Sequence, residues 1–177
     1  MHFIVPTQTT TWRTLTESRA TSLVLGVLLL VAASKIAIPI EPVPITLGSA
    51  AALLIGLTYT PRAAFETLAI WLGLAACGLP VISSPALLGP SSGYLLGCLI
   101  AAPTMAYLLQ KRARNSAWFL LLTVLLGNVI IYGFGIAWLT NYMDRLAAVQ
   151  VGLLPFIWTG CSKALLLAAG VRLVRQK

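Results

Sequence analysis

One lysine in the last apolar segment is the first candidate for chemistry. Lys163 has apolar residues on both sides, in a stretch from Leu153 to Leu167. A charge at bilayer depth costs about 3 kcal/mol on insertion scales, so such a residue usually faces a protein interior or an aqueous cavity and has a function there. The alternative is that Lys163 snorkels to the membrane interface or donates to backbone carbonyls.

The acidic residues leave this lysine without a counterion inside the membrane. All four of them lie near segment ends: Glu17, Glu41, Glu66 and Asp144. An intramembrane cation without an intramembrane anion suggests that the anion arrives from outside. Glu66 is expected to pair with Arg62 instead, because the two lie four residues apart on a helix. We therefore expect Lys163 to meet the anionic group of a small ligand.

A few other polar and aromatic residues complete a candidate site. Asn128 and Tyr132 lie one helical turn apart, as do Thr159 and Lys163, so the members of each pair share a face. The aromatic candidates for pocket walls are Trp71, Tyr94, Tyr132 and Trp158. A mostly apolar pocket with a few convergent polar groups is the usual form of a small-molecule site. Two alternatives stay open, because aromatics also form interfacial belts and Asn128 is also suited to joining two helices.

The composition predicts an integral membrane protein. The chain has 177 residues, of which 59% are hydrophobic and only 9% are charged, whereas soluble domains carry about 25% charged residues. The net charge of +8 does not indicate nucleic-acid binding. The basic residues lie in short loops and tails beside apolar runs, where membrane topology places them.

Hydropathy predicts an all-α fold with six transmembrane helices in one domain (18–177), after a polar cytoplasmic tail (1–17). The expected segments are Ala20–Ile38, Ile45–Tyr59, Arg62–Cys77, Gly93–Leu109, Ala117–Thr140 and Val149–Leu173. The second and third are short for a span of about 20 residues. Every positive cluster falls on one side if both termini are cytoplasmic, which indicates a multi-pass protein of the plasma (inner) membrane. The loops Pro39–Pro44, Gly78–Ser92 and Asn141–Ala148 are then external.

The first external loop is expected to act as a lid. It contains Pro39, Pro42 and Pro44 within six residues. Proline fixes φ and excludes the α region for the residue before it, so this stretch is extended and stiff. The alternative is an ordinary connector, which rarely needs three prolines.

The sequence offers no catalytic set, so we do not expect an enzyme. Phosphate-binding glycine motifs are missing, and the only histidine, His2, lies in the polar tail, so a metal site is not expected. Cys77, Cys98 and Cys161 have unrelated spacings and are expected to be small buried apolar residues. Such a chain binds a solute and depends on a partner, or moves the solute passively.

Several motifs, in order along the chain, resemble one family. They are Ile38–Leu47, Gly78–Val81, the Gly-Pro-Ser-Ser-Gly-Tyr run Gly89–Tyr94, Ile131–Leu139, and Leu154-Pro155-Phe156 followed by Gly160 and Lys163. Together they are similar to the BioY family, the biotin-specific substrate-binding subunits of energy-coupling-factor transporters. The resemblance implies a six-helix subunit that binds biotin from outside under its first loop. It also implies a transmembrane coupling protein and paired cytoplasmic ATPases as partners, and no cofactor.

The resemblance also implies roles for individual residues. The expected substrate-binding residues are Thr46, Trp71, Ser92, Tyr94, Asn128, Tyr132, Cys161 and Lys163. Ser22 and Gly26 form a small pair on the first helix, which permits close helix approach and is the expected contact with the coupling protein.

Three departures from the family pattern concern the ligand. Cys161 stands where an aspartate is usual, Gly48-Ser49 where Gln-Thr is usual, and Trp71 where a tyrosine is usual. The first two remove hydrogen-bonding groups, so the recognition of the ureido ring stays open. Lys163 is retained, and biotin's carboxylate is the anion it requires, although backbone amides are an alternative partner for that carboxylate.

Two other functions stay open: binding of a different small anionic vitamin, and a membrane scaffold without a solute.

Overall fold

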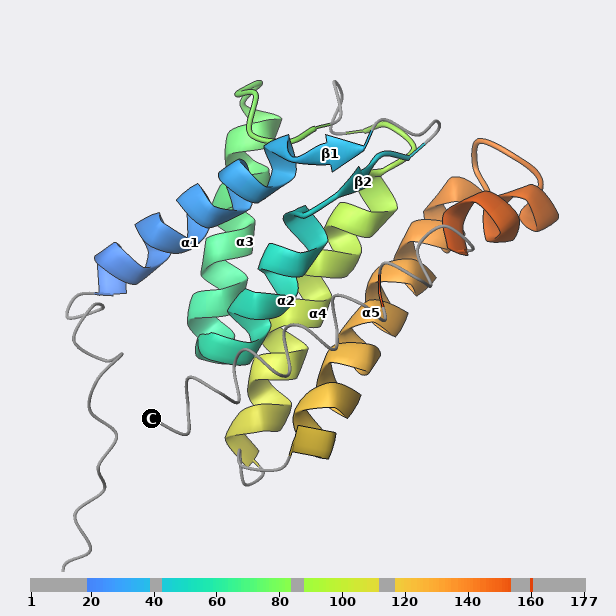
Figure 1. The fold of residues 1–177 in the computed structure, drawn as a ribbon. Helices are drawn as coiled ribbons and strands as arrows, with labels where there is room; N and C mark the ends of the chain where they lie inside the picture. Colours follow the sequence, from blue (N-terminus) through green and yellow to red (C-terminus); the bar gives the residue numbers. More distant parts are fainter. Residues whose placement is uncertain (1–18, 39–42, 84–87, 112–116, 154–159, 161–177) are drawn as a thin grey trace, which may run out of the picture.

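The computed structural model is a helical bundle with a small strand pair at one end (Figure 1). It describes residues 19–38, 43–83, 88–111, 117–153 and 160. Its helices are α1 (Arg19–Lys35), α2 (Gly48–Thr58), α3 (Pro61–Ala76), α4 (Ser92–Lys111) and α5 (Ala117–Leu139). Residues 145–153 are also helical. The expected helical architecture is confirmed, and a two-residue strand pair is added to it.

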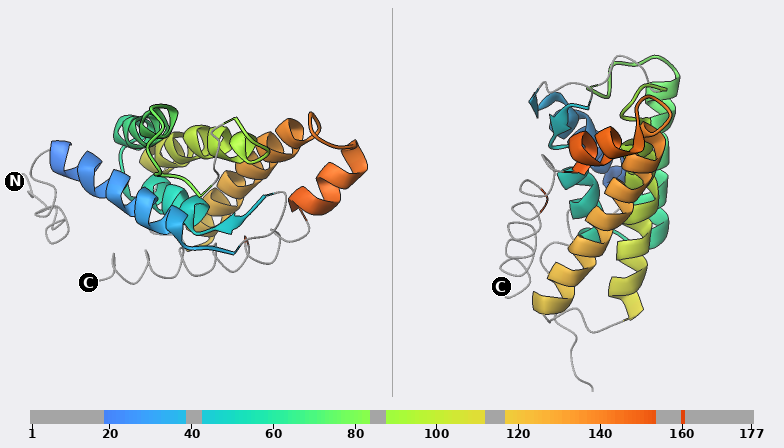
Figure 2. Two further views of the ribbon diagram at one scale, coloured as in Figure 1. Left: turned by 90° about the horizontal axis from the view of Figure 1, so that it is seen from above. Right: turned by 90° about the vertical axis from the view of Figure 1, so that its right-hand side faces the viewer.

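Helix α4 forms the centre of the bundle. It packs against α2, α3 and α5, while α1 lies across α2 and α3 (Figure 2). The buried face of α4 carries Ala101, Ala102 and Ala106, and small residues let neighbouring helix backbones come close. Larger apolar side chains, among them Leu53 and Met105, fill the remaining core.

The chain leaves helix α1 earlier than the sequence predicted. Strand β1 (Ala37–Ile38) pairs antiparallel with β2 (Ile45–Thr46), and the Leu47 amide donates to the Ile36 carbonyl at 3.1 Å. The prediction of helix up to Ile38 and again from Ile45 was therefore wrong at both ends. Proline-rich sequence on the loop side disfavours helix, and strand pairing satisfies the backbone groups instead. The β1–β2 pair therefore holds the two ends of the proline-rich loop next to each other.

The turn between α2 and α3 is as tight as the sequence predicted. Thr60 caps α3, since its side-chain oxygen accepts from the Ala63 amide at 3.3 Å, and Pro61 occupies the first helical turn. A hydroxyl at the N-cap and a proline directly after it are both favourable at a helix start. Both helices are short, with 11 residues in α2 and 16 in α3.

Polar contacts join the start of α1 to the α2–α3 turn. Glu66 pairs with Arg62 at 3.0 Å, which confirms the expected pairing, and it also forms an ion pair with Arg19 of α1. The Tyr59 hydroxyl donates to the Ser22 carbonyl at 2.7 Å. Exposed ion pairs contribute little each, so this set mainly fixes where α1 lies.

Gly26, a predicted contact with the coupling protein, packs inside the bundle. The residue is buried inside the bundle, and a Cβ at this position would lie 2.7 Å from Thr67 Cγ2 and 3.1 Å from the Tyr59 hydroxyl. The glycine therefore serves the packing of α1 on α2 and α3. The outward face of α1 carries large apolar side chains instead, including Leu25 and Leu28.

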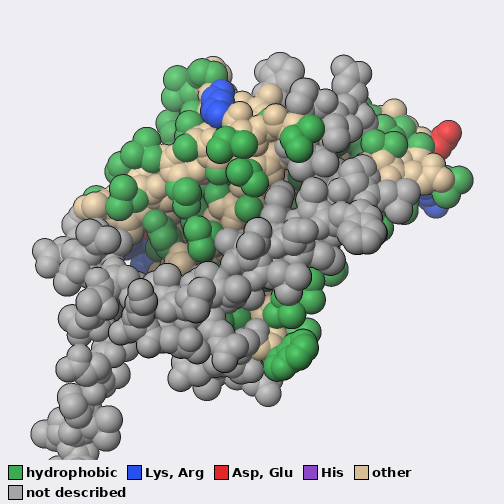
Figure 3. All heavy atoms as spheres, viewed as in Figure 1, with side chains coloured by type: hydrophobic (Ala, Val, Ile, Leu, Met, Phe, Trp, Pro, Cys, Tyr) green, Lys and Arg blue, Asp and Glu red, His purple; other side chains and the backbone are tan. Residues whose placement is uncertain are grey.

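Two helices within the described ranges are long and apolar enough to cross a bilayer. They are Ser92–Lys111 and Trp118–Leu139, judged by length and composition. Hydrophobic side chains also dominate the exposed surface over α1 (Figure 3). Such a surface is unusual for a soluble monomer and is suited to lipid or to a protein partner.

Candidate functional site

A cavity lies at the end of the bundle that carries the strand pair. Its free space, counted together with the solvent at its mouth, is about 620 Å³. All the helices α1–α5 or their adjoining loops contribute to it. The described lining residues are Ser34, Val43, Pro44, Thr46, Gly48, Ser49, Trp71, Ile82, Ser83, Ser91, Tyr94, Leu95, Cys98, Ile131 and Tyr132.

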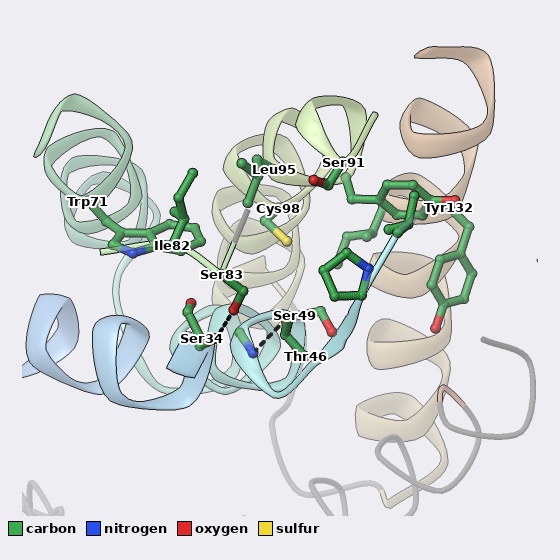
Figure 4. Close-up of a pocket in the computed structure, with 15 residues that line it drawn as sticks. Ser34, Thr46, Ser49, Trp71, Ile82, Ser83, Ser91, Leu95, Cys98 and Tyr132 are labelled. Atoms are coloured by element: carbon green, nitrogen blue, oxygen red, sulfur yellow. Dashed lines mark hydrogen bonds between the residues drawn. The ribbon is translucent and has the colours of Figure 1, made fainter. Parts of the chain in front are cut away.

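Aromatic and aliphatic side chains form most of the cavity wall. Trp71 reaches it from α3, Leu95 from α4 and Tyr132 from α5 (Figure 4). Tyr94 of α4 also lines it. Because flat rings bury a large apolar area, this wall is suited to a compact, largely apolar ring system.

Hydroxyl groups gather along one side of the cavity. Ser34, Thr46, Ser49 and Ser83 make up this side, which we call the hydroxyl edge (Figure 4). The Ser83 hydroxyl donates to the Ser34 carbonyl, and the Gly48 amide donates to Thr46 Oγ1 at 3.3 Å. None of the described lining residues has a charged side chain, so their polar contacts with a ligand are hydrogen bonds.

Side-chain to backbone hydrogen bonds hold the surrounding loops in place. Trp71 Nε1 donates to the Val81 carbonyl at 3.0 Å, and Trp138 Nε1 donates to the Gly89 carbonyl at 3.2 Å. The Tyr94 hydroxyl donates to the Gly152 carbonyl at 2.9 Å, which ties α4 to the helical residues 145–153. The cavity is therefore built by contacts between segments far apart in the sequence.

This arrangement has counterparts in known proteins. The family model described as "BioY family" matches residues 7–177. The chain belongs to the BioY family. This is a family of transporters, and its model covers nearly the whole length of the chain.

Curated relatives in the BioY family carry transporter names. The chain is 36% identical to the "Probable biotin transporter BioY" of Rickettsia prowazekii, over 81% of this chain and 76% of the relative. It is 34% identical to the "Biotin transporter BioY" of Thermotoga maritima, over 84% of this chain and 90% of the relative.

A solved structure has the same fold. It is described as the "S-component for biotin from an ECF-type ABC transporter" and superposes with a TM-score of 0.80. The match covers 90% of this chain and 91% of the other, at 25% identity. The helical arrangement is therefore that of a known S-component for biotin.

The structure brings several of the predicted site residues together. Thr46, Trp71, Tyr94 and Tyr132 all line the cavity, together with Pro44 of the expected lid. They come from four different elements, so their proximity is a result of the fold. Their contact with a ligand stays a prediction.

Two predicted site residues lie elsewhere. Ser92 is buried, and its hydroxyl donates to the Gly89 carbonyl at 2.7 Å, while the neighbouring Ser91 lines the cavity. Asn128 is buried inside α5, where its amide donates to the Val124 carbonyl at 3.2 Å. Neither residue is among those that line the cavity. Ser92 therefore bonds to its neighbouring loop and Asn128 bonds within its own helix, and a contact of either residue with a ligand stays a prediction.

Some predictions fall outside the described residues. These are the positions Pro39 and Pro42 of the loop, and Trp158, Thr159, Cys161 and Lys163 of the last segment. Of the other cysteines, Cys98 is buried and lines the cavity, whereas Cys77 is exposed after the end of α3, so the expectation of burial was wrong for Cys77.

Sequence reasoning missed much of the hydroxyl edge. Ser34 and Ser83 were not singled out as site residues, although both line the cavity. Serine is common in loops and helix ends, so its presence carries no signal of its own. Their positions in the sequence could have indicated a site, because both residues lie in or beside the proline- and glycine-rich loops that were expected to cover it.

Proposed function

We propose that this chain is the biotin-binding subunit of a membrane uptake system. One observation carries the proposal: in a member of the BioY family, the described lining of a cavity is uncharged, has aromatic walls and one hydroxyl edge, and includes Val43 and Pro44 at the end of the proline-rich segment. Its described lining fits a compact bicyclic ring. The relatives' names support biotin as that ligand.

The chemistry of biotin matches the two kinds of surface in the cavity. Its fused ring is compact and mostly apolar, and its urea group is neutral and polar. Trp71, Tyr94 and Tyr132 offer the apolar wall, and the hydroxyl edge offers hydrogen bonds. Biotin's carboxylate needs a cation, and we propose Lys163 for this role, with Cys161 nearby in sequence. A charge-assisted hydrogen bond is stronger than a neutral one.

The proposed setting is the plasma membrane, with six spans and both termini in the cytoplasm. Residues 18–177 form the transmembrane domain and residues 1–17 the polar tail. Two long apolar helices support this proposal, as does the one-sided placement of basic residues along the chain. The cavity end of the bundle then faces outward, because it carries the proline-rich loop.

The subunit is proposed to bind its ligand without chemical change, and to depend on other proteins for energy. Its partners are a transmembrane coupling protein and cytoplasmic ATPases, and it uses no cofactor. The description of the similar structure as an S-component of an ECF-type transporter supports this arrangement. The sequence itself has no phosphate-binding motif to supply energy.

The proline-rich loop is proposed to close over the bound ligand. Val43 and Pro44, at its end, already line the cavity, and Val43 is buried there. The strand pair fixes both ends of the loop. A stiff loop with fixed ends loses little conformational entropy when it closes.

Biotin binding to the full purified chain tests the function. We expect saturable binding of radiolabelled biotin and a rise in melting temperature when biotin is added. Competition by another anionic vitamin, with no effect of biotin, would favour the alternative of a different vitamin subunit. Absence of any ligand-induced shift across a vitamin panel would favour the scaffold alternative.

A further inference from the structure

The hydroxyl of Ser34 is the most unusual polar group in the cavity. Ser34 lies in the last turn of α1 and is only 3% exposed. Among the residues that the structure describes, its Oγ has no hydrogen-bond partner. A buried hydroxyl without a partner is costly, so it normally has one in the functional state of a protein.

Other helical hydroxyls in the bundle behave differently. The hydroxyls of Thr58, Thr67, Thr104 and Thr123 each donate to the carbonyl four residues earlier, at 2.7–2.8 Å. This is the usual way for a hydroxyl to be satisfied inside a helix. Ser34 has the same option in α1 but does not use it. Ser34 is instead one of the residues that border the cavity (Figure 4), and its buried Oγ stays unpaired there.

Gly48 makes room for this hydroxyl. A Cβ at position 48 would lie 2.8 Å from Ser34 Oγ and 3.3 Å from Thr46 Oγ1. Both Gly48 and Ser34 line the cavity. Because position 48 has no side chain, nothing from α2 crowds the buried Ser34 Oγ at the border of the cavity.

The backbone of Ser34 is held from the other side. Its carbonyl accepts a hydrogen bond from the Ser83 hydroxyl, so the loop after α3 fixes the end of α1 at this point. The neighbouring Trp71–Val81 hydrogen bond fixes the same loop. The Ser34 side chain is thus presented on a rigid support, as a specific ligand contact requires.

We infer that Ser34 is a specificity-determining residue whose hydroxyl hydrogen-bonds the neutral urea end of the ligand. This inference rests on the proposed function and adds the orientation of the ligand in the cavity. The hydroxyl edge offers neutral hydrogen bonds and no cation among its described residues, so the urea end of the ligand, and not its carboxylate, belongs there.

The first test compares Ser34→Ala with the wild type in the full chain. Biotin affinity should fall about 3- to 10-fold, as for loss of a neutral hydrogen bond. The melting temperature without ligand should be equal or higher, because the substitution removes an unpaired hydroxyl and no contact. The matched control is Thr123→Val, which removes a satisfied buried hydroxyl outside the cavity. It should lower the melting temperature and leave biotin affinity unchanged.

Ligand analogues identify which end of biotin meets Ser34. Tetrahydrothiophene-2-pentanoate keeps the sulfur ring and the acid chain but lacks the urea, so Ser34→Ala should not weaken its binding further. Biotin amide changes only the carboxylate end, so its loss of affinity should add to that of Ser34→Ala. Gly48→Ala should weaken biotin binding by displacing the hydroxyl, with little further loss when combined with Ser34→Ala.

The outcomes separate this inference from the function on which it rests. Wild-type affinity for biotin in Ser34→Ala would overturn the inference and leave the function standing. Equal losses for biotin and for the urea-free analogue, with a lower melting temperature, would also overturn it, because Ser34 would then be structural. A wild-type chain that does not bind biotin would overturn both.

Discussion

The indole of Trp71 in α3 donates a 3.0 Å hydrogen bond to the carbonyl of Val81 in the following loop. Trp71 is buried and lines the cavity, and the next two residues of that loop, Ile82 and Ser83, line it as well. One side chain therefore forms part of the wall and also holds a second part of the wall in place.

Trp71→Phe should separate these two roles. Phenylalanine keeps an aromatic wall but cannot donate to Val81, so about 0.5–1.5 kcal/mol of stability is lost. We expect a lower melting temperature and faster biotin dissociation, measured by scintillation proximity after dilution. The control is Trp118→Phe, since Trp118 is 75% exposed on α5 and should tolerate the change. Unchanged dissociation in Trp71→Phe would mean that the loop does not depend on this bond.

Gly26→Leu should damage the bundle itself. The new side chain would collide with Thr67 and Tyr59, so α1 could not keep its place on α2 and α3. We expect a clear drop in the melting temperature of the isolated subunit in detergent. Ala20→Leu is the control, because Ala20 is exposed on the same helix. A stable Gly26→Leu subunit that fails only in uptake would instead support the predicted contact with the coupling protein.

The sequence allowed the helical architecture and most helix boundaries to be predicted, because apolar runs and prolines have direct local effects. Helix α3 was expected at Arg62–Cys77 and lies at Pro61–Ala76. The strand pair was missed because two residues per strand leave no periodic pattern. The aromatic wall was predicted from residue type with an interfacial belt as the alternative, and the burial of Trp71 and Tyr94 beside the cavity favours the wall.

The sequence did not allow the hydroxyl edge or the burial of Gly26 to be predicted, because both depend on which helix faces pack together. The spacing of Ser22 and Gly26 permits a close contact but does not say whether it is internal. The spacing of Asn128 and Tyr132 predicts a shared face in the same way, but not that Tyr132 lines the cavity and Asn128 bonds within its own helix. These features become visible only when α1, α2 and α5 are placed in space.

Replacing Pro42 and Pro44 with glycine should accelerate ligand release. Glycine increases the freedom of the open loop, so closing it costs more conformational entropy. The strand pair at the base should survive, because neither proline belongs to β1 or β2. We expect an unchanged melting temperature without ligand and a higher dissociation rate for biotin. An unchanged dissociation rate would identify the loop as a simple connector.

A cysteine at position 41 should react only from outside the cell. Glu41 lies in the proline-rich loop, and the clusters of basic residues lie on the other side of the expected topology. In a background without native cysteines, Glu41→Cys should be labelled by an impermeant maleimide in intact cells. A cysteine at Arg112, between α4 and α5, should be labelled only after the cells are opened. The reverse pattern would invert the proposed topology.

Lys163→Met should weaken biotin binding by about one to two decades. A buried charge-assisted hydrogen bond contributes roughly 1.5–3 kcal/mol, and each decade of affinity corresponds to about 1.4 kcal/mol. Methionine keeps the apolar length of the side chain and removes the charge. Biotin amide should bind the wild type poorly and lose little further affinity in the mutant, because both changes act on one contact. Fully additive losses would mean that the carboxylate and Lys163 do not meet. Lys163 would then be a snorkelling residue, and the carboxylate would be held by backbone amides.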